Sequence, residues 1–266
     1  MTTVTTTPGV RTRDVLASEW IKLRTVRSTY LTLLSAAVAA VGVGYLVAHA
    51  DATHWPSMNP AARAAFDPVA DSFSGLGLAQ LAFGVIGVLA ISSEYATGLI
   101  RTTFAAVPGR RAVLAAKAAV VGAVTLLTGE LVAFATFFAG QQALSARHLD
   151  VTLAHPGALR GVLAAGFYLA VTAWVGLGLG AVIRHTAGAI SAMIAVVFLV
   201  PTIIHALPAP WDTRIGRYTL DGAAHQMIAQ HPQPGYLSAG PSFLVCAAYV
   251  VAAIAVAAVL ITRRDA

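Results

Sequence analysis

The sequence predicts an all-α membrane protein with six transmembrane helices, and three observations support this fold class. Hydrophobic residues make up 58% of the 266-residue chain, charged residues make up only 11%, and the mean hydropathy is +0.76. A soluble domain carries about 25% charged residues, because its surface faces water. Several nearly charge-free windows reach the roughly 20 residues that a helix needs to cross the hydrocarbon layer. These windows lack the alternation of the ~10-residue strands in outer-membrane barrels.

The six predicted spans are 29–49, 74–92, 115–139, 161–183, 187–207 and 241–262. The first is longer than the 7–15 apolar residues of a secretory signal, so we expect it to be retained. Pro201 should bend the fifth span, because proline lacks a backbone N–H. We expect residues 13–266 to form a single transmembrane domain.

The orientation of the spans follows from the lysines and arginines. If Lys117 at the start of the third span is included, twelve of the 17 lie before the first span, between spans two and three or four and five, or after the sixth. Positive charge concentrates on the cytoplasmic side, so both termini should lie in the cytoplasm and the chain in the cell membrane. This distribution and attraction to anionic lipids explain the net charge of +6, so nucleic acid is not needed as a partner.

The N-terminal region has two parts. Residues 1–12 are rich in threonine and are expected to be disordered. Residues 13–27 are predicted to form an amphipathic helix on the cytoplasmic membrane interface, with Trp20 in its apolar arc and Lys22 opposite. Its interfacial anchors would be Trp20, Lys22, Arg24 and Arg27. Continuation of the first span as one long helix is the alternative.

Residues 93–114 form the longest predicted cytoplasmic loop. Ile100, Phe104 and Val107 fall at helical spacing, and Pro108-Gly109 should end the helix. The pattern favours a short docking helix that presents an apolar face, Glu94 and Arg101 to the cytoplasm. A helix lying on the protein's own inner surface is the alternative that the pattern leaves open.

The outer connection 208–240 is unusually long and rich in turn-forming residues. Loops of more than about 15 residues without a function are uncommon. Half-helices that dip back into the interface, and a plain external cap, both fit this segment.

Few residues suggest chemistry within the chain. It contains neither the phosphate-binding G-x-x-x-x-G-K-[ST] nor the metal-binding H-E-x-x-H, so we expect no catalytic residue, metal or cofactor. Cys246, the only cysteine, is expected to be a small buried hydrophobe. Glu130 is the one carboxylate within a predicted span, and two interpretations remain open: a functional polar site, or a protonated or hydrogen-bonded group near Thr125 or Thr128 that faces another helix.

Two segments resemble a known family. SEWIKLRTVRS (residues 18–28) precedes the first span, and EYATGLIRTT (residues 94–103) is followed by Pro108 and Arg110-Arg111. Both are similar to segments of ABC transporter permeases of the type-2 exporter class, in their actinobacterial form. Leu99 departs from the threonine or serine that is usual after this glycine.

This resemblance implies a function and partners. The loop after the second span would be a coupling helix that sits in a cleft of a separate ATPase subunit, with coupling candidates Glu94, Tyr95, Gly98, Arg101 and Thr102. Two copies of the ATPase, which would hold ATP and Mg, would join two permease subunits, the second being a copy or a paralogue. The family also implies re-entrant helices within 208–240 and export.

The expected substrate is a hydrophobic or amphipathic drug, lipid or peptide. Two other function classes remain as alternatives. An ATP-independent secondary transporter or channel would need mid-membrane charged sites or internal repeats. A membrane-embedded enzyme would need clustered polar residues at one face, for which the scattered outer histidines are the only candidates.

Overall fold

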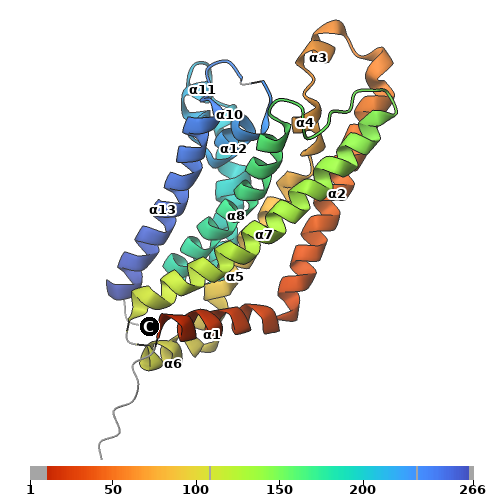
Figure 1. Ribbon diagram of the computed structural model, residues 1–266. Helices are drawn as coiled ribbons and strands as arrows, with labels where there is room; N and C mark the ends of the chain where they lie inside the picture. The colour runs from red at the N-terminus through yellow and green to blue at the C-terminus, as the bar shows by residue number, and fades with distance from the viewer. Residues whose placement is uncertain (1–10, 108, 232, 264–266) are drawn as a thin grey trace, which may run out of the picture.

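The computed structural model describes residues 11–107, 109–231 and 233–263, and every regular element within them is helical (Figure 1). Six helical segments are long and apolar enough to cross a membrane, which confirms the predicted all-α membrane protein with six spans. They are Arg27–Ser57, Leu76–Thr97, Arg110–Ser145, Ala158–Ile183, Thr186–His205 and Ala239–Arg263.

The bundle is built around α8 (Ala158–Ile183), the most buried of the six spans. Helices α5 (Leu76–Thr97), α7 (Arg110–Ser145) and α13 (Ala239–Arg263) pack against it, and α2 (Arg27–His54) packs against α7 and α5. Most of the surface of α2 and α13 faces outward, as an apolar helix in contact with lipid requires.

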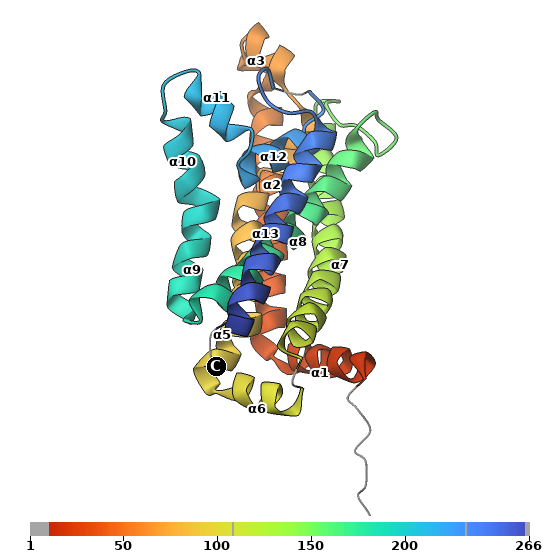
Figure 2. The same cartoon turned by 90° about the vertical axis from the view of Figure 1, so that its left-hand side faces the viewer.

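One end of the bundle carries both ends of the described chain. Helix α1 (Thr12–Thr25), helix α6 (Leu99–Ala106) and the last turn of α13 lie together there, as Figures 1 and 2 show from two directions. We call this end the basal end. Residues 1–10, which make up most of the segment predicted to be disordered (1–12), lie outside the described residues.

Helix α1 is separate from α2, so the alternative of one long N-terminal helix is wrong. Val26 has an extended conformation (φ −83°, ψ 104°) and forms an elbow, after which α2 runs along the bundle (Figure 1). The face that α1 buries matches the predicted apolar arc only in part. Val15 is buried and Leu23 half-buried, as the arc predicts, but Trp20 is 47% exposed. Glu19 is buried and Lys22 half-buried, because Lys22 pairs with two buried carboxylates.

Helices α5 and α8 approach closely because glycines line their contact. A Cβ atom at Gly87 would lie 1.9 Å from the carbonyl oxygen of Ala173, and one at Gly176 would lie 2.1 Å from that of Gly84. No side chain fits at either position, so the two backbones are in direct contact.

The fifth span is divided at the position where a proline interrupts its hydrogen bonding. Helix α9 (Thr186–Ile194) is followed by a π-helical turn, Ala195–Leu199, and then by α10 (Val200–His205), which contains Pro201. Proline has no N–H to donate to the preceding turn, and the wider π turn accommodates that gap.

Short helices close the end opposite the basal end. The first connection contains a 3₁₀ turn (Trp55–Ser57), α3 (Pro60–Ala65) and α4 (Pro68–Ser72); the second contains α11 (Trp211–Gly216) and α12 (Leu220–Ile228). Helix α12 is largely buried and packs against α8 and α13. The segment 208–240 therefore inserts a helix into the bundle and is more than a loose cap.

Candidate functional site

A cluster of four charged side chains lies inside the basal end. Glu19 and Lys22 come from α1, Glu94 from the last turns of α5, and Lys117 from the third turn of α7. Glu19 and Lys117 are each 3% exposed and Glu94 is 5% exposed. Charged groups are almost never buried to this extent unless they are paired, and these four pair with one another.

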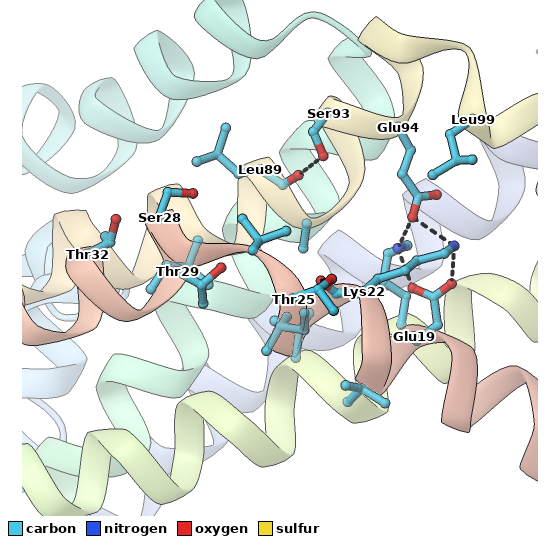
Figure 3. A pocket seen from close by; sticks show the side chains of 17 residues that line it. Glu19, Lys22, Thr25, Ser28, Thr29, Thr32, Leu89, Ser93, Glu94 and Leu99 are labelled. Atoms are coloured by element: carbon cyan, nitrogen blue, oxygen red, sulfur yellow. Dashed lines mark hydrogen bonds and ion pairs between the residues drawn. The ribbon is translucent and has the colours of Figure 1, made fainter.

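The two lysines bridge the two carboxylates, as Figure 3 shows. The Nζ atom of Lys22 donates to Glu19 Oε1 at 2.7 Å and to Glu94 Oε1 at 2.9 Å. The Nζ atom of Lys117 donates to Glu94 Oε1 at 2.8 Å and also to Glu19 Oε2. With two acids and two bases, the cluster has no net charge. It joins α1, α5 and α7 by direct ion pairs.

Lys22 keeps its charge in this setting. Burial alone would lower the pKa of Lys22, but hydrogen bonds to Glu19 and Glu94, together with their negative charges, outweigh burial and raise it. The side chain of Lys22 is 30% exposed, so it forms the water-accessible edge of the cluster.

Glu94 is not placed as the sequence suggested. We expected it in a loop, presented to the cytoplasm beside Arg101. Instead α5 continues to Thr97, and Glu94 points into the bundle toward the two lysines. A charged side chain such as Glu94 can be buried when it pairs with opposite charges inside the protein. The helix can therefore continue beyond the apolar residues of its span.

Helix α6 lies at the basal end, directly after α5. Gly98 joins the two helices in the left-handed conformation (φ 73°), which glycine adopts without strain. Ile100 and Phe104 are buried against the bundle, so the helix does lie on the protein's own surface. Its other side leaves Leu99, Arg101 and Thr102 exposed. Pro108, expected to end this helix, lies outside the described residues; α6 ends at Ala106.

Tyr95 follows Glu94 on α5 and contacts the short connection between α8 and α9. Its ring contacts the guanidinium group of Arg184, whose Cζ atom is 5.1 Å from the ring centroid. Arg184 ends α8 in the left-handed conformation (φ 59°). Of the five coupling candidates, Arg101 and Thr102 are exposed, Gly98 and Tyr95 are partly buried, and Glu94 is buried.

The predicted membrane anchors separate into two groups. Trp20, Arg24 and Arg27 are exposed on the α1–α2 elbow, where a lipid interface can reach them. Lys22 belongs instead to the ion cluster. The hydroxyl group of Tyr30 donates to the carbonyl oxygen of Arg24 at 2.9 Å and braces the elbow.

Glu130 is far from the basal cluster, on the side of α7 that faces α8. Its carboxyl carbon fills the space left by Gly166, where a Cβ atom would lie 2.4 Å away. The hydroxyl groups of Thr125 and Thr128 donate to carbonyl oxygens of their own helix, so neither reaches Glu130. Glu130 therefore packs against another helix as one interpretation expected, but without the threonine partners.

A pocket of about 380 Å³ adjoins the ion cluster, between the elbow of α1 and α2 and the basal halves of α5 and α7. Glu19, Lys22, Glu94 and Lys117 all line it. Sequence reasoning missed Glu19 and Lys117 as site residues. Two signals could have indicated them: the Glu19–Lys22 spacing of three residues, and the single lysine at the start of a span whose only other charged residue is Glu130.

Comparison of the chain with models of known protein families gives no match, and no curated protein matches it either.

Proposed function

We propose that this chain is the membrane-spanning permease subunit of an ATP-driven ABC exporter, acting with a separate ATPase subunit. The observation that carries the proposal is α6: a short helix at one end of a six-span bundle, held on its apolar side and exposed on the other. The resemblance of residues 94–103 to a coupling helix adds to it.

The exposed side of α6 has the properties of a docking surface for another protein. Leu99 is 44% exposed and offers apolar contact, and Arg101 and Thr102 add a positive charge and a hydrogen-bonding group. Buried Ile100 and Phe104 hold the helix against the bundle, so a partner meets a preformed surface.

Movement of α6 would reach the rest of the bundle by two connections. Gly98 links it to α5, and the ion pairs of Glu94 link α5 to α1 and α7. In the proposed cycle, two ATPases bind ATP and Mg, close together, and push on the α6 helices of two permease subunits. The bundles then move as rigid bodies and open the path to the outside.

The proposal also includes the orientation of the chain in the membrane and the chemical class of the transported molecule, its cargo. The basal end, with both termini, faces the cytoplasm, in agreement with the twelve basic residues on that side. The cargo is a hydrophobic or amphipathic molecule, because the helices between which it would pass are lined with alanine, leucine, valine and phenylalanine.

The proposal predicts that a P-loop ATPase is encoded in a neighbouring reading frame. The test co-expresses that ATPase with this chain and purifies the two together in nanodiscs. Arg101→Glu reverses the exposed charge of α6 and is expected to reduce ATPase co-purification and ATPase activity at least tenfold. Arg111→Glu makes the same change at an exposed position of α7 and serves as the matched control. Glu94→Ala is unsuitable, because it would break the ion cluster rather than the docking surface.

Binding and activity that survive Arg101→Glu as well as Arg111→Glu would contradict the docking role of α6. Substrate transport by the chain alone in ATP-free vesicles would instead support the secondary transporter and overturn the ABC proposal.

A further inference from the structure

The pocket beside the ion cluster has a size and shape that the proposed coupling role does not require. Its volume of about 380 Å³ lies within the range of small-molecule sites, roughly 300–1,000 Å³. Residues of α1 and of the first turns of α2, from Glu19 to Thr32, line it, and Figure 3 shows several of their side chains. An interfacial helix such as α1 lies at the depth of lipid head groups, so the pocket is at the same depth.

The walls of this pocket differ in chemistry. Apolar side chains from α5 and α7 form one wall: Ile86, Leu89, Ala90, Val120 and Val121. The elbow forms the other, with Lys22 and the hydroxyl groups of Ser28, Thr29 and Thr32. In the part of the chain that the structure describes, these three hydroxyl groups make no hydrogen bond, whereas that of Ser93 donates to Leu89 O at 2.6 Å. The polar wall therefore offers unused donors to a ligand.

The start of α2 adds backbone donors to the polar wall. The helix begins at Arg27, and its cap residue Val26 has no side chain that could accept from the first turn. The carbonyl oxygen of Val26 accepts from Thr29 N at 3.1 Å, which leaves the N–H groups of Arg27 and Ser28 as donors. The first N–H groups of a helix need an acceptor, and the positive end of the helix dipole favours an anion. Together with the Lys22 ammonium group and the nearby hydroxyl groups, this turn suits a phosphate group.

The ion cluster leaves one acceptor unused. Glu94 is 5% exposed, and its Oε1 atom accepts from both lysines. Its Oε2 atom is buried and has no hydrogen-bond partner among the described residues. An unpaired buried carboxylate oxygen is costly, so a donor from outside the chain would be stabilising here.

We propose that this pocket binds one aminophospholipid from the membrane leaflet that borders the basal end. Its phosphate accepts from the first turn of α2, the hydroxyl groups of Ser28 and Thr29, and Lys22. Its ammonium group donates to the free oxygen of Glu94, and its first acyl carbons lie on the wall of Ile86, Leu89 and Val121. This site does not depend on the proposed transport role.

The proposal distinguishes between head groups. Phosphatidylethanolamine carries both a phosphate and an ammonium group with N–H donors. Phosphatidylcholine has the same charges but no N–H, and phosphatidylglycerol has a phosphate but no ammonium group. The hydroxyl groups of phosphatidylglycerol can donate, but they carry no positive charge. Of the three lipids, only phosphatidylethanolamine therefore offers the Glu94 carboxylate a charged N–H donor while its phosphate accepts from the elbow.

The test is native mass spectrometry of the full chain, delipidated in detergent and titrated with each of these three lipids. We expect one phosphatidylethanolamine per chain, bound at least tenfold more tightly than the other two. Thr29→Val removes a donor at constant shape, and Ala90→Leu fills the pocket; each is expected to weaken binding at least fivefold. Thr53→Val is the matched control, because Thr53 lies on the same helix at the far end and its hydroxyl donates to His49 O.

Equal binding of the three lipids would overturn the proposal. So would a loss in Thr29→Val and Ala90→Leu no larger than in Thr53→Val. Soluble glycerophosphoethanolamine distinguishes the source of the head group: competition as strong as that of the lipid would show a free phosphate ester as ligand and overturn the membrane assignment.

Discussion

Substitution of Lys117 by methionine is the sharpest test of the buried ion cluster. The change keeps an unbranched side chain of similar length but removes one of the two positive charges. Glu19 and Glu94, which are 3% and 5% exposed, would then share Lys22 alone. The cluster would carry one uncompensated negative charge in a place that water scarcely reaches.

The structure predicts a large cost for this change and a smaller one for the other lysine. Breaking a buried ion pair by removing one partner costs about 3–5 kcal/mol. Lys22→Met should cost only about 1–2 kcal/mol, because Lys22 is 30% exposed and water can replace part of its contribution. Glu94→Gln added to Lys117→Met removes the unpaired charge as well, so the double variant should be at least about 1 kcal/mol more stable than the sum of the single changes.

The assay measures unfolding in mixed micelles by titration with SDS. The fluorescence of the four tryptophans reports the fraction of unfolded protein. Arg111→Met, an exposed basic residue of the same helix, is the control and should change the free energy of unfolding by less than about 0.5 kcal/mol. A cost below about 1 kcal/mol for Lys117→Met, or equal costs for the two lysines, would refute the reasoning.

Two further predictions concern packing and pH. Gly87→Ala should lower the free energy of unfolding by about 3 kcal/mol, because its Cβ atom would overlap the backbone of Ala173, whereas Gly42→Ala, with nothing within 4 Å, should raise it by about 0.5–1 kcal/mol. The same SDS titration compares them, and equal effects would be inconsistent with glycine-mediated contact. Burial is the main reason that the pKa of Asp71 is raised to about 7, and the neighbouring carboxylate of Asp51 adds to the effect. The unfolded carboxyl group loses its proton near pH 3.9, so the folded state binds more protons between about pH 4 and 7, and stability falls as the pH rises through that window. Asp71→Asn should therefore be more stable than the wild type above pH 7, by at most about 4 kcal/mol, and melting curves that differ equally at pH 4 and pH 8 would argue against this.

The helices were predictable because the lipid bilayer imposes a simple requirement. Each span needs about 20 apolar residues, and charge-free windows of that length mark them directly. The helix ends were less predictable. Helix α5 reaches Thr97 and α7 begins at Arg110, since residues outside the apolar window can remain helical when their side chains are paired or exposed.

The site was only partly predictable for a related reason. The segment 94–103 drew attention by its charge and helical spacing, and α6 lies there. The partnership of Glu19 with Lys117 joins residues 98 positions apart, and no local pattern reports which way two such side chains point across a bundle. Judged singly, the same charges suggest exposed positions, as they did for Glu94 and Lys22.

The glycine contact between α5 and α8 determines which parts of the bundle can shift relative to one another. Two helices whose backbones touch have no side-chain layer between them that could rearrange, so α5 and α8 must travel as one block. Helices α2 and α13 also touch this block closely: a Cβ atom at Gly75, just before α5, would lie 2.2 Å from the carbonyl oxygen of Ala40 on α2, and one at Gly178 on α8 would lie 2.9 Å from that of Ala253 on α13. Most of the surface of α2 and α13 nevertheless faces outward. A force applied at α6 would thus displace α5 and α8 together, and α2 and α13 would move against them only away from these two contacts.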